Sequence, residues 1–285
     1  MHTMGNLNHM PMGDDEIWYL YSAFCRISLP RNKVIANDYC YQHAKWSIFI
    51  SSSILQENNI PVRQNIIYGT KARLLLIAIN TYAIVNRTSE ITLSHSFNQL
   101  LTKLKLAPRG GKNSPAQYLK EQLKALITCS ITLCTEKSYL DINPIQGVCG
   151  VDLFNNNKSQ RSGDIVISLS SDYYQLLLAN SVPLRKSHIL SLKNSALALD
   201  IYAWLTLRVF EIESTNRPVK IRWVPLKSQF GQEYGCKKSF KREFKQKLQR
   251  VIDIHPFNVA IVTGGILLKP SPRPVHPFQL DINET

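Results

Sequence analysis

The sequence has too few acidic residues to balance its basic ones. There are 20 Asp and Glu against 34 Lys and Arg in 285 residues, which gives a formal net charge of +14 and a pI of about 9.5. Such an excess indicates an anionic partner. Glycine and proline are also scarce, at 12 and 14 residues, while 44% of the residues are hydrophobic. This composition excludes a collagen-like or disordered chain.

Three patterns are missing, and each absence removes a class of protein. The six cysteines contain no Cys-x-x-Cys pair, so neither a zinc ribbon nor a secreted disulfide framework is expected. The seven histidines contain no His-x-His pair, and we expect neither a metal site nor a cofactor. No apolar run approaches the roughly 18 residues that a membrane span needs. With no signal-peptide pattern either, we expect a cytoplasmic protein.

Periodicity predicts that one order of elements occurs twice. In the C-terminal half we predict helices over residues 195–212, 225–230 and 238–254, with a strand over 219–223 before the second helix and a hairpin over 259–268. In the N-terminal half we predict helices over 71–86, after Ser94 or Ser96, and from Ser114-Pro115, with strands over 90–93, 130–135 and 139–143. We interpret this order as a tandem duplication.

Helix, strand, helix, turn, helix and hairpin is the order of the winged variant of the helix-turn-helix. The predicted fold class is therefore α+β, with two tandem winged-helix domains preceded by a small β-rich N-terminal segment. We expect a flexible tail over 1–15, the N-terminal segment and first domain over 16–190, the second domain over 191–275 and a C-terminal tail over 276–285. Residues 25–29 and 46–50 are predicted strands, 165–169 a strand, 172–179 a helix, and 182–191 a connector.

The third helix of the second unit has two distinct faces. Phe240, Phe244, Leu248 and Val251 form one apolar stripe at helical spacing. Residues 237–250 contain seven Lys and Arg against the single acid Glu243, so local ion pairs cannot neutralise the other face. This pattern favours DNA binding over mere solubility. The predicted DNA-binding residues here are Lys237, Lys238, Lys241, Arg242 and Lys245.

The first unit carries a weaker version of the same signal. Its basic candidates for phosphate contact are Arg109, Lys112, Lys120 and Lys124, with Glu121 as the one acid among them. Three short polar residues, Asn113, Ser114 and Gln117, could reach base edges, although Ser114 as a helix cap and Asn113 as a turn residue are equally good readings.

Two cations stand where a helix disfavours them. Lys71 and Arg73 fall in the first turn of a predicted helix, at the positive end of its dipole. Free N–H groups beside positive side chains bind anions, so we expect a DNA phosphate here. The alternative, two solvated cations at a small cost in stability, is equally consistent with the sequence.

Several segments together resemble the plasmid-encoded RepA family of replication initiators. The similarity extends from about Phe24 to Val275 and is carried by ALALDIYAWLTLRV, KIRWVPLKSQFGQEYG, FKREFKQKLQRV, GGILLKPSPRPV, YGTKARLLLIAINTYAI, LSHSFNQLLTKLKL and RGGKNSPAQYLKEQLKAL. The resemblance implies a bacterial protein that binds short repeats of double-stranded DNA in a plasmid origin and recruits host replication proteins. It also implies repression of the initiator's own promoter, and a homodimer is a further expectation.

Two other functions compete with this one. A rolling-circle initiator would cleave DNA with a tyrosine, for which Tyr173-Tyr174 is the candidate, but the metal-binding His-x-His pair is missing. We therefore expect no enzymatic activity. A winged-helix transcription regulator without a replication role would use the same residues and stays open. Gly111-Lys112 resembles a P-loop only in part, because Leu106 stands where the first glycine belongs.

Overall fold

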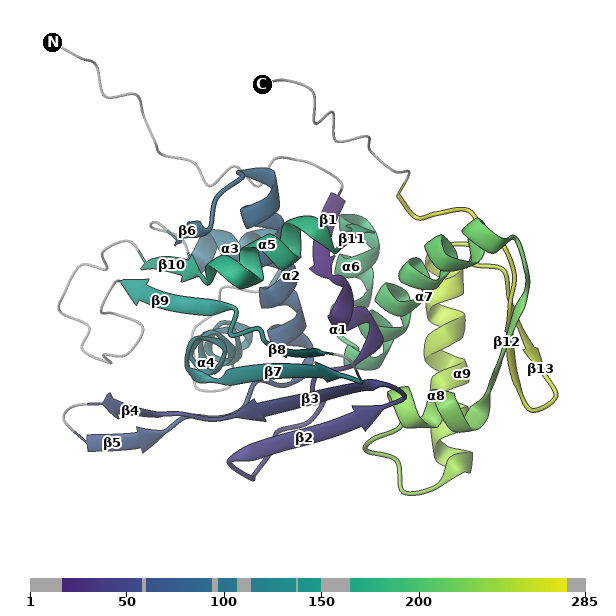
Figure 1. Ribbon diagram of the computed structural model, residues 1–285, viewed down its shortest axis with the longest axis horizontal. Coiled ribbons are helices and arrows are strands. Elements are labelled where there is room, and N and C mark those ends of the chain that lie inside the picture. Colours follow the sequence, from purple (N-terminus) through teal and green to yellow (C-terminus); the bar gives the residue numbers. More distant parts are fainter. Residues whose placement is uncertain are drawn as a thin grey trace, which may run out of the picture.

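A computed structural model describes residues 17–57, 60–93, 97–106, 114–136, 138–149 and 165–275. The tails predicted at 1–15 and 276–285 lie outside these residues. Helices and strands are mixed along the chain, which confirms the α+β class. Two long helices, α2 (Gly69–Val85) and α7 (Ala196–Thr215), contact each other in the middle of the molecule (Figure 1). Both are apolar around most of their circumference, as expected of buried helices.

The C-terminal unit has the predicted order of elements. After α7 come β12 (Val219–Arg222), α8 (Trp223–Phe230), α9 (Lys237–Ile254), β13 (Val259–Val262) and β14 (Gly265–Leu268). The three strands form an antiparallel sheet in the order β12-β14-β13. Gly264 takes a positive φ of 86° in the hairpin turn, and a Cβ at Gly265 would lie 1.9 Å from the Ile221 carbonyl oxygen. Both glycines are thus required by the hairpin.

The N-terminal unit repeats this order with a different hairpin from the one we predicted. It comprises α2, β6 (Glu90–Leu93), α3 (Phe97–Lys103), α4 (Pro115–Thr128), β9 (Ile145–Cys149) and β10 (Ile165–Leu169). Its strands pair in the order β6-β10-β9, which matches β12-β14-β13. In both units, the strand after the first helix pairs with the second strand of the later hairpin.

The hairpin predicted at 130–143 exists but belongs to another sheet. It consists of β7 (Ser130–Thr135) and β8 (Ser138–Asp141), and it joins β2 (Asp38–His43) and β3 (Trp46–Ser51) in the order β2-β3-β7-β8. The cause is a second apolar strand: Ile48 and Ile50 of β3 face Leu133 and Ile131 of β7, and all four are fully buried. A separate hairpin follows β3, with β4 (Ile54–Glu57) and β5 (Ile60–Arg63).

Two further predictions are wrong, and both concern the segment that joins the halves. Residues 25–29 are not a strand, because β1 (Ile17–Tyr21) is followed at once by the short helix α1 (Ser22–Arg26). Residues 182–191 are not a connector, because β11 (Ser181–Arg185) pairs antiparallel with β1 and α6 (Lys186–Leu192) follows it. The helix α5 (Ser171–Ala179) precedes β11. The predicted domain boundary at 190/191 thus falls within α6.

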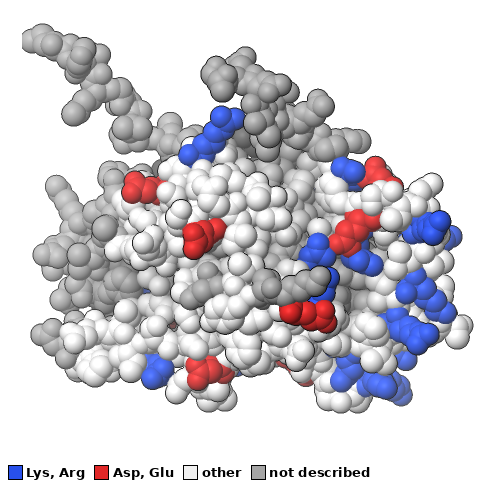
Figure 2. Space-filling view, in the orientation of Figure 1, with Lys and Arg blue, Asp and Glu red and all other residues white. Residues whose placement is uncertain are grey.

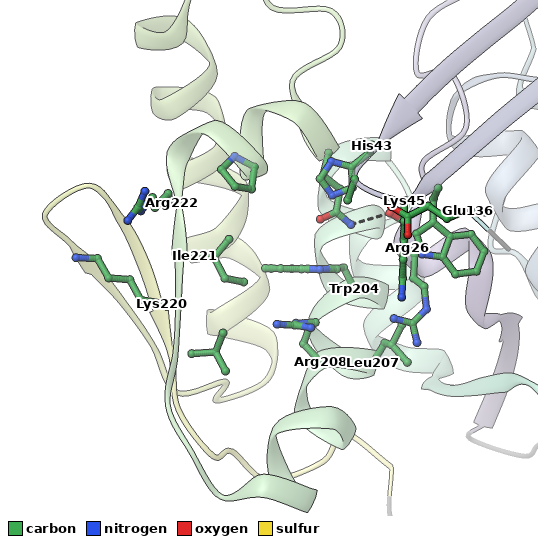
Figure 3. Close-up of a pocket in the computed structure, with 15 residues that line it drawn as sticks. Arg26, His43, Lys45, Glu136, Trp204, Leu207, Arg208, Lys220, Ile221 and Arg222 are labelled. Carbon is green, nitrogen blue, oxygen red and sulfur yellow. Dashed lines mark hydrogen bonds between the residues drawn. The ribbon is translucent and has the colours of Figure 1, made fainter. Parts of the chain in front are cut away.

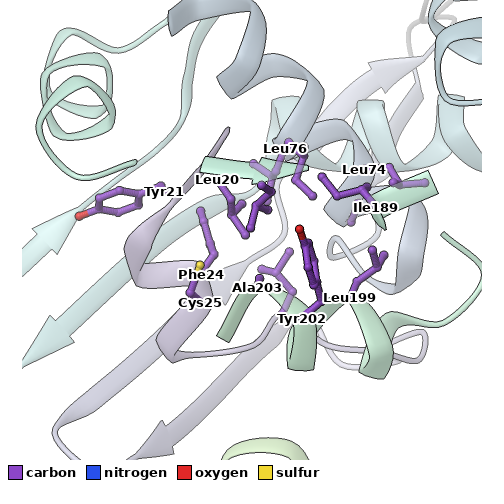
Figure 4. Packing of buried hydrophobic residues seen from close by; sticks show 14 of the residues in the cluster. Leu20, Tyr21, Phe24, Cys25, Leu74, Leu76, Ile189, Leu199, Tyr202 and Ala203 are labelled. Atoms are coloured by element: carbon purple, nitrogen blue, oxygen red, sulfur yellow. The ribbon is translucent and has the colours of Figure 1, made fainter. Parts of the chain in front are cut away.

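One apolar core is shared by both halves of the chain (Figure 4). The side chains labelled there come from β1 and α1, from α2, from α6 and from α7. Leu76 of α2 and Tyr202 of α7 are both almost completely buried within this cluster. The close-packed contacts between α2 and α7 fix the position of one unit against the other.

Candidate nucleic-acid interface

Helix α9 separates its apolar and cationic residues cleanly. Phe240, Phe244, Leu248 and Val251 are all buried, with exposed fractions of 1% or less. The Phe244 ring lies 5.6 Å from that of Phe230 and 6.0 Å from that of Trp223, measured between centroids. Such aromatic contacts hold the helix by its inner face. The opposite face is consequently presented to solvent.

The cationic face of α9 is exposed and lacks acidic partners. Lys237, Lys238, Arg242 and Lys245 are exposed, and Lys241 is partly buried. Of the two acids of the helix, Glu243 pairs with Lys247 at 3.0 Å, and Asp253, in the last turn, accepts from the Gln249 side chain at 2.8 Å. Among the residues that the structure describes, no carboxylate pairs with the five predicted DNA-binding cations of α9.

Two of these cations are positioned by an aromatic ring. The ammonium groups of Lys241 and Lys245 lie 5.5 and 5.7 Å from the centroid of the Trp223 ring. Cation–π contacts orient the two side chains without neutralising their charge. Lys241 and Lys245 thus lie side by side on the helix with their charges intact. In the view of Figure 2, Lys and Arg side chains gather over the C-terminal unit, on the right.

The corresponding helix of the N-terminal unit, α4, is less clearly an interface. The Ser114 hydroxyl oxygen accepts from the Gln117 backbone N–H at 3.1 Å, as expected if Ser114 is a helix cap. The Gln117 side chain donates to Glu121 at 3.2 Å. Lys120 and Lys124 are half-buried and make interactions within the protein. Arg109, Lys112 and Asn113 lie outside the described residues.

The expectation of a phosphate at Arg73 is wrong. Its side chain is only 6% exposed, and its guanidinium binds the Asp200 carboxylate through Nε at 2.6 Å and Nη2 at 2.8 Å. The same guanidinium donates to the backbone carbonyls of Leu29, Pro30 and Gly69. With its donors used inside the protein, Arg73 joins α2 to α7 and cannot meet DNA.

Lys71 differs from Arg73, and its phosphate contact stays a prediction. The side chain is half-buried, and burial lowers its pKa, with a smaller contribution from the nearby cation Lys193. Two cations held close together at a helix start keep this spot attractive to an anion.

Residues of the N-terminal half also bind the turn that precedes α9. These contacts were not predicted from the sequence. The Tyr41 hydroxyl of β2 donates to the Ser228 carbonyl oxygen, and the Tyr39 hydroxyl donates to the Gln232 side chain. Burial raises the pKa of both tyrosines, so both hydroxyls stay protonated donors. Glu233 accepts from the backbone N–H groups of Arg31 and Asn32 at 3.1 and 2.8 Å.

These contacts join residues between 187 and 202 positions apart, and no local pattern reveals them. The only available signal was the alternation of Tyr39, Tyr41 and His43 on one side of a strand. Their effect is to set the direction of α9 relative to the N-terminal unit.

A comparison with protein families gives the chain its identity. The model of the family described as plasmid encoded RepA protein matches residues 66–224, more than half of the chain. The chain belongs to this RepA family. It is therefore a plasmid replication-related protein. The matched region begins just before α2 and ends at the second residue of α8, so α9 lies beyond it.

No curated protein matches this RepA family member. Among the described residues, no helix is both long enough and apolar enough to cross a membrane.

Proposed function

We propose that this RepA family member is a plasmid replication initiator that binds duplex DNA at repeated sites in the plasmid origin. The observation that carries the proposal is the exposed face of α9, where Lys237, Lys238, Lys241, Arg242 and Lys245 have no acidic partner among the described residues. A cationic face that is not neutralised within the protein is stabilised by phosphates, which also supply most of the affinity of DNA-binding proteins.

In this proposal both units are winged helices. Supporting it are the shared order of helix, strand, helix, helix and hairpin and the shared strand orders β12-β14-β13 and β6-β10-β9. In winged helices the third helix enters the major groove and the hairpin follows the backbone. The helices α9 and α4 would read successive grooves about 10 base pairs apart, on a site of roughly 20 base pairs. The wing of the N-terminal unit would then be β9–β10, not β7–β8.

The bound initiator would recruit host replication proteins in the bacterial cytoplasm and repress its own promoter, as a monomer or a homodimer. We assign it no strand-cleaving activity. Of the candidate pair Tyr173-Tyr174, Tyr174 is partly buried, whereas Tyr173 is completely buried and its hydroxyl lies 2.9 Å from the side-chain amide of Asn80. Burial also raises the pKa of this phenol, the opposite of what a nucleophile requires.

The test uses the DNA that flanks the gene. Footprinting should protect repeated sites of roughly 20 base pairs, and the log of affinity should fall with log salt at a slope near 7 if about eight phosphates are neutralised. Transferring the gene with its flanking DNA onto a non-replicating marker should establish replication. Specific binding without replication would point to a transcription regulator. A covalent tyrosyl adduct on supercoiled origin DNA, formed with Mg²⁺ or Mn²⁺ present, would show an enzyme instead.

A further inference from the structure

The strand β12 has one free edge. In its sheet β12 pairs only with β14, and no described strand lies on its other side. The Trp223 backbone N–H donates to the Gly264 carbonyl in continuation of this ladder. Antiparallel pairing alternates, so Val219 and Ile221 turn their backbone groups to β14 and Lys220 and Arg222 turn theirs to the free edge. This edge is available to another strand.

A cleft runs beside the free edge. It has a volume of about 790 Å³, and all four residues of β12 line it. Across from β12 it is bounded by residues 43–46, from the end of β2 to the start of β3, and by Arg26 of α1. Trp204 and Leu207 of α7 contribute apolar surface to its wall. The cleft thus lies between the two halves of the chain, beside β12 and α7.

The two faces of β12 differ chemically at this edge. Figure 3 shows the Ile221 side chain pointing into the cleft toward Trp204, while Lys220 and Arg222 point away from it. The two cationic side chains are exposed, and among the described residues neither has a hydrogen-bond or ion-pair partner. A strand added here would therefore meet an apolar environment on one face and positive charge on the other.

We propose that the free edge of β12 binds an extended segment of a partner protein in which acidic residues alternate with apolar ones. Backbone groups of the segment would pair with Lys220 and Arg222, as in other cases of strand addition to a sheet edge. Its apolar side chains would lie in the cleft against Ile221, Trp204 and Leu207. Its carboxylates would lie on the other face, opposite the Lys220 and Arg222 side chains.

Edge protection alone does not explain this arrangement. Lys and Arg on an edge strand discourage unspecific pairing, and a four-residue strand is short. Protection does not require an apolar cleft beside the strand, and burying apolar surface there would favour an occupant. Arg26 and Arg208, two of the cations that line the cleft, both bind Glu211, at 2.7 and 2.6 Å, so their charge is partly neutralised within the protein. This partial neutralisation makes the cleft less suited to a phosphate.

The test begins with a random twelve-residue peptide library displayed on phage and selected on the full chain. The strongest peptides are then synthesised with a fluorescein label, and their affinities are measured by fluorescence anisotropy. We expect enriched peptides in which Asp or Glu alternates with Ile, Val, Leu or Phe. Absence of such alternation among the enriched peptides, or no enrichment at all, would overturn the proposal.

A matched pair of variants at Lys220 isolates the backbone contact. Lys220→Ala removes the charge and keeps the edge N–H, whereas Lys220→Pro removes both without touching the ladder to β14. We expect Lys220→Ala to weaken the peptide a few-fold and Lys220→Pro to weaken it at least tenfold more. Equal affinities for the two variants would exclude strand addition. Thermal unfolding of each variant shows whether the fold is retained, and Arg222→Glu offers a second charge variant that keeps its edge N–H.

DNA affinity is measured on the same proteins. This measurement distinguishes a failure of the peptide site from a failure of the proposed DNA binding. Lys220→Pro should bind origin DNA as the unaltered chain does, and Lys241→Glu should lose DNA affinity but keep the peptide. An oligothymidylate of 20 nucleotides serves as a competitor. If it displaces the peptide and its own binding depends on Lys220, the occupant is a nucleic acid and the proposal is wrong.

Discussion

Arg73 and Asp200 form a buried ion pair between the two central helices, with N–O distances of 2.6 and 2.8 Å. Both side chains are less than a tenth exposed. Arg31 adds a third charge at 3.4 Å from the same carboxylate and also donates to the Phe230 carbonyl. The charges thus link α2, the chain after α1 and the end of α8, where the N-terminal half meets the C-terminal unit.

Removing one partner of this pair should be costly. Asp200→Asn leaves two buried guanidinium groups without a counter-charge, and we expect the free energy of unfolding to fall by about 3–5 kcal/mol. Urea unfolding measures this loss. The partly exposed pair of Arg26 and Glu211 provides the control, since Arg26→Gln should cost only about 0–1 kcal/mol. A loss below 1 kcal/mol in Asp200→Asn would contradict the structural role of the pair.

Variants of the same residues test whether Arg73 binds Asp200 rather than a DNA phosphate. The double variant Arg73→Met with Asp200→Leu replaces the pair by apolar groups but leaves Arg31 without its carboxylate, so it should recover only part of the lost stability. Once it is folded, its DNA affinity should depend on salt as that of the unaltered chain does. A salt slope lower by about one would show instead that Arg73 neutralises a phosphate.

The C-terminal unit could be predicted from the sequence because its signals are local. The stripe from Phe240 to Val251 and the Gly264-Gly265 turn each act within a few residues. Residues 219–222 alternate between half-buried and exposed, as a strand with one buried face should.

The errors have a common physical cause, which is pairing between distant segments. Residues 181–185 look like a connector until β1 is placed beside them, because each strand is short and stable only when paired. The hairpin at 130–141 joins a different sheet from the predicted one because β3, the strand it pairs with, lies about 80 residues earlier in the chain. The prediction for Arg73 is wrong because its partner Asp200 is 127 positions away.

Charge reversal on α9 should weaken DNA binding in proportion to the phosphates lost. We expect Lys241→Glu and Arg242→Glu each to lower affinity for origin DNA and to reduce the salt slope by about one if the side chain contacts a phosphate. Filter binding or anisotropy at several salt concentrations measures both quantities. Loss of preference for the origin over random DNA would show that the residue reads a base.

The control for these variants is Lys269→Glu, an exposed lysine that follows β14. It changes the net charge by the same amount outside α9, so its effect on affinity should be small. Lys241 also contacts the Trp223 ring, so its variant can lose up to about 1 kcal/mol of stability for that reason alone. DNA binding is therefore compared well below the unfolding temperature. Equal losses of DNA affinity in Lys269→Glu and Lys241→Glu would show that α9 is not the contact surface.

Substitutions at Ser114 distinguish a role as helix cap from a role in contacting a base. Its hydroxyl oxygen accepts from the Gln117 N–H, so Ser114→Ala should lower the free energy of unfolding by about 1 kcal/mol, and Ser114→Asp should restore it. Below the unfolding transition we expect Ser114→Ala to bind origin DNA as tightly as the unaltered chain. A lower affinity in the folded Ala variant, together with altered site preference, would show that the hydroxyl reaches a base.

The pair of His188 and His255 should make stability depend on pH. Burial, then the nearby charges of His255 and Arg185, lower the pKa of His188 to about 4. Its Nδ1 lies 3.1 Å from the Tyr202 hydroxyl, and its ring centroid lies 5.6 Å from that of His255. In the unfolded chain the same group titrates near 6.5. The unfolded state thus binds the proton first, and stability should fall as the pH drops from about 6.5 toward 4.

His188→Asn removes this titration while other groups keep theirs. We expect the free energy of unfolding, measured in urea at pH 7, 6 and 5, to fall less steeply in the variant than in the unaltered chain. The pH dependence of the variant His43→Asn is a suitable comparison. Burial lowers the pKa of His43 as well, and this residue lies at the contact between β2 and α8. Parallel curves for His188→Asn and the unaltered chain would mean that His188 takes up its proton equally in both states, contrary to its position against Arg185 and His255.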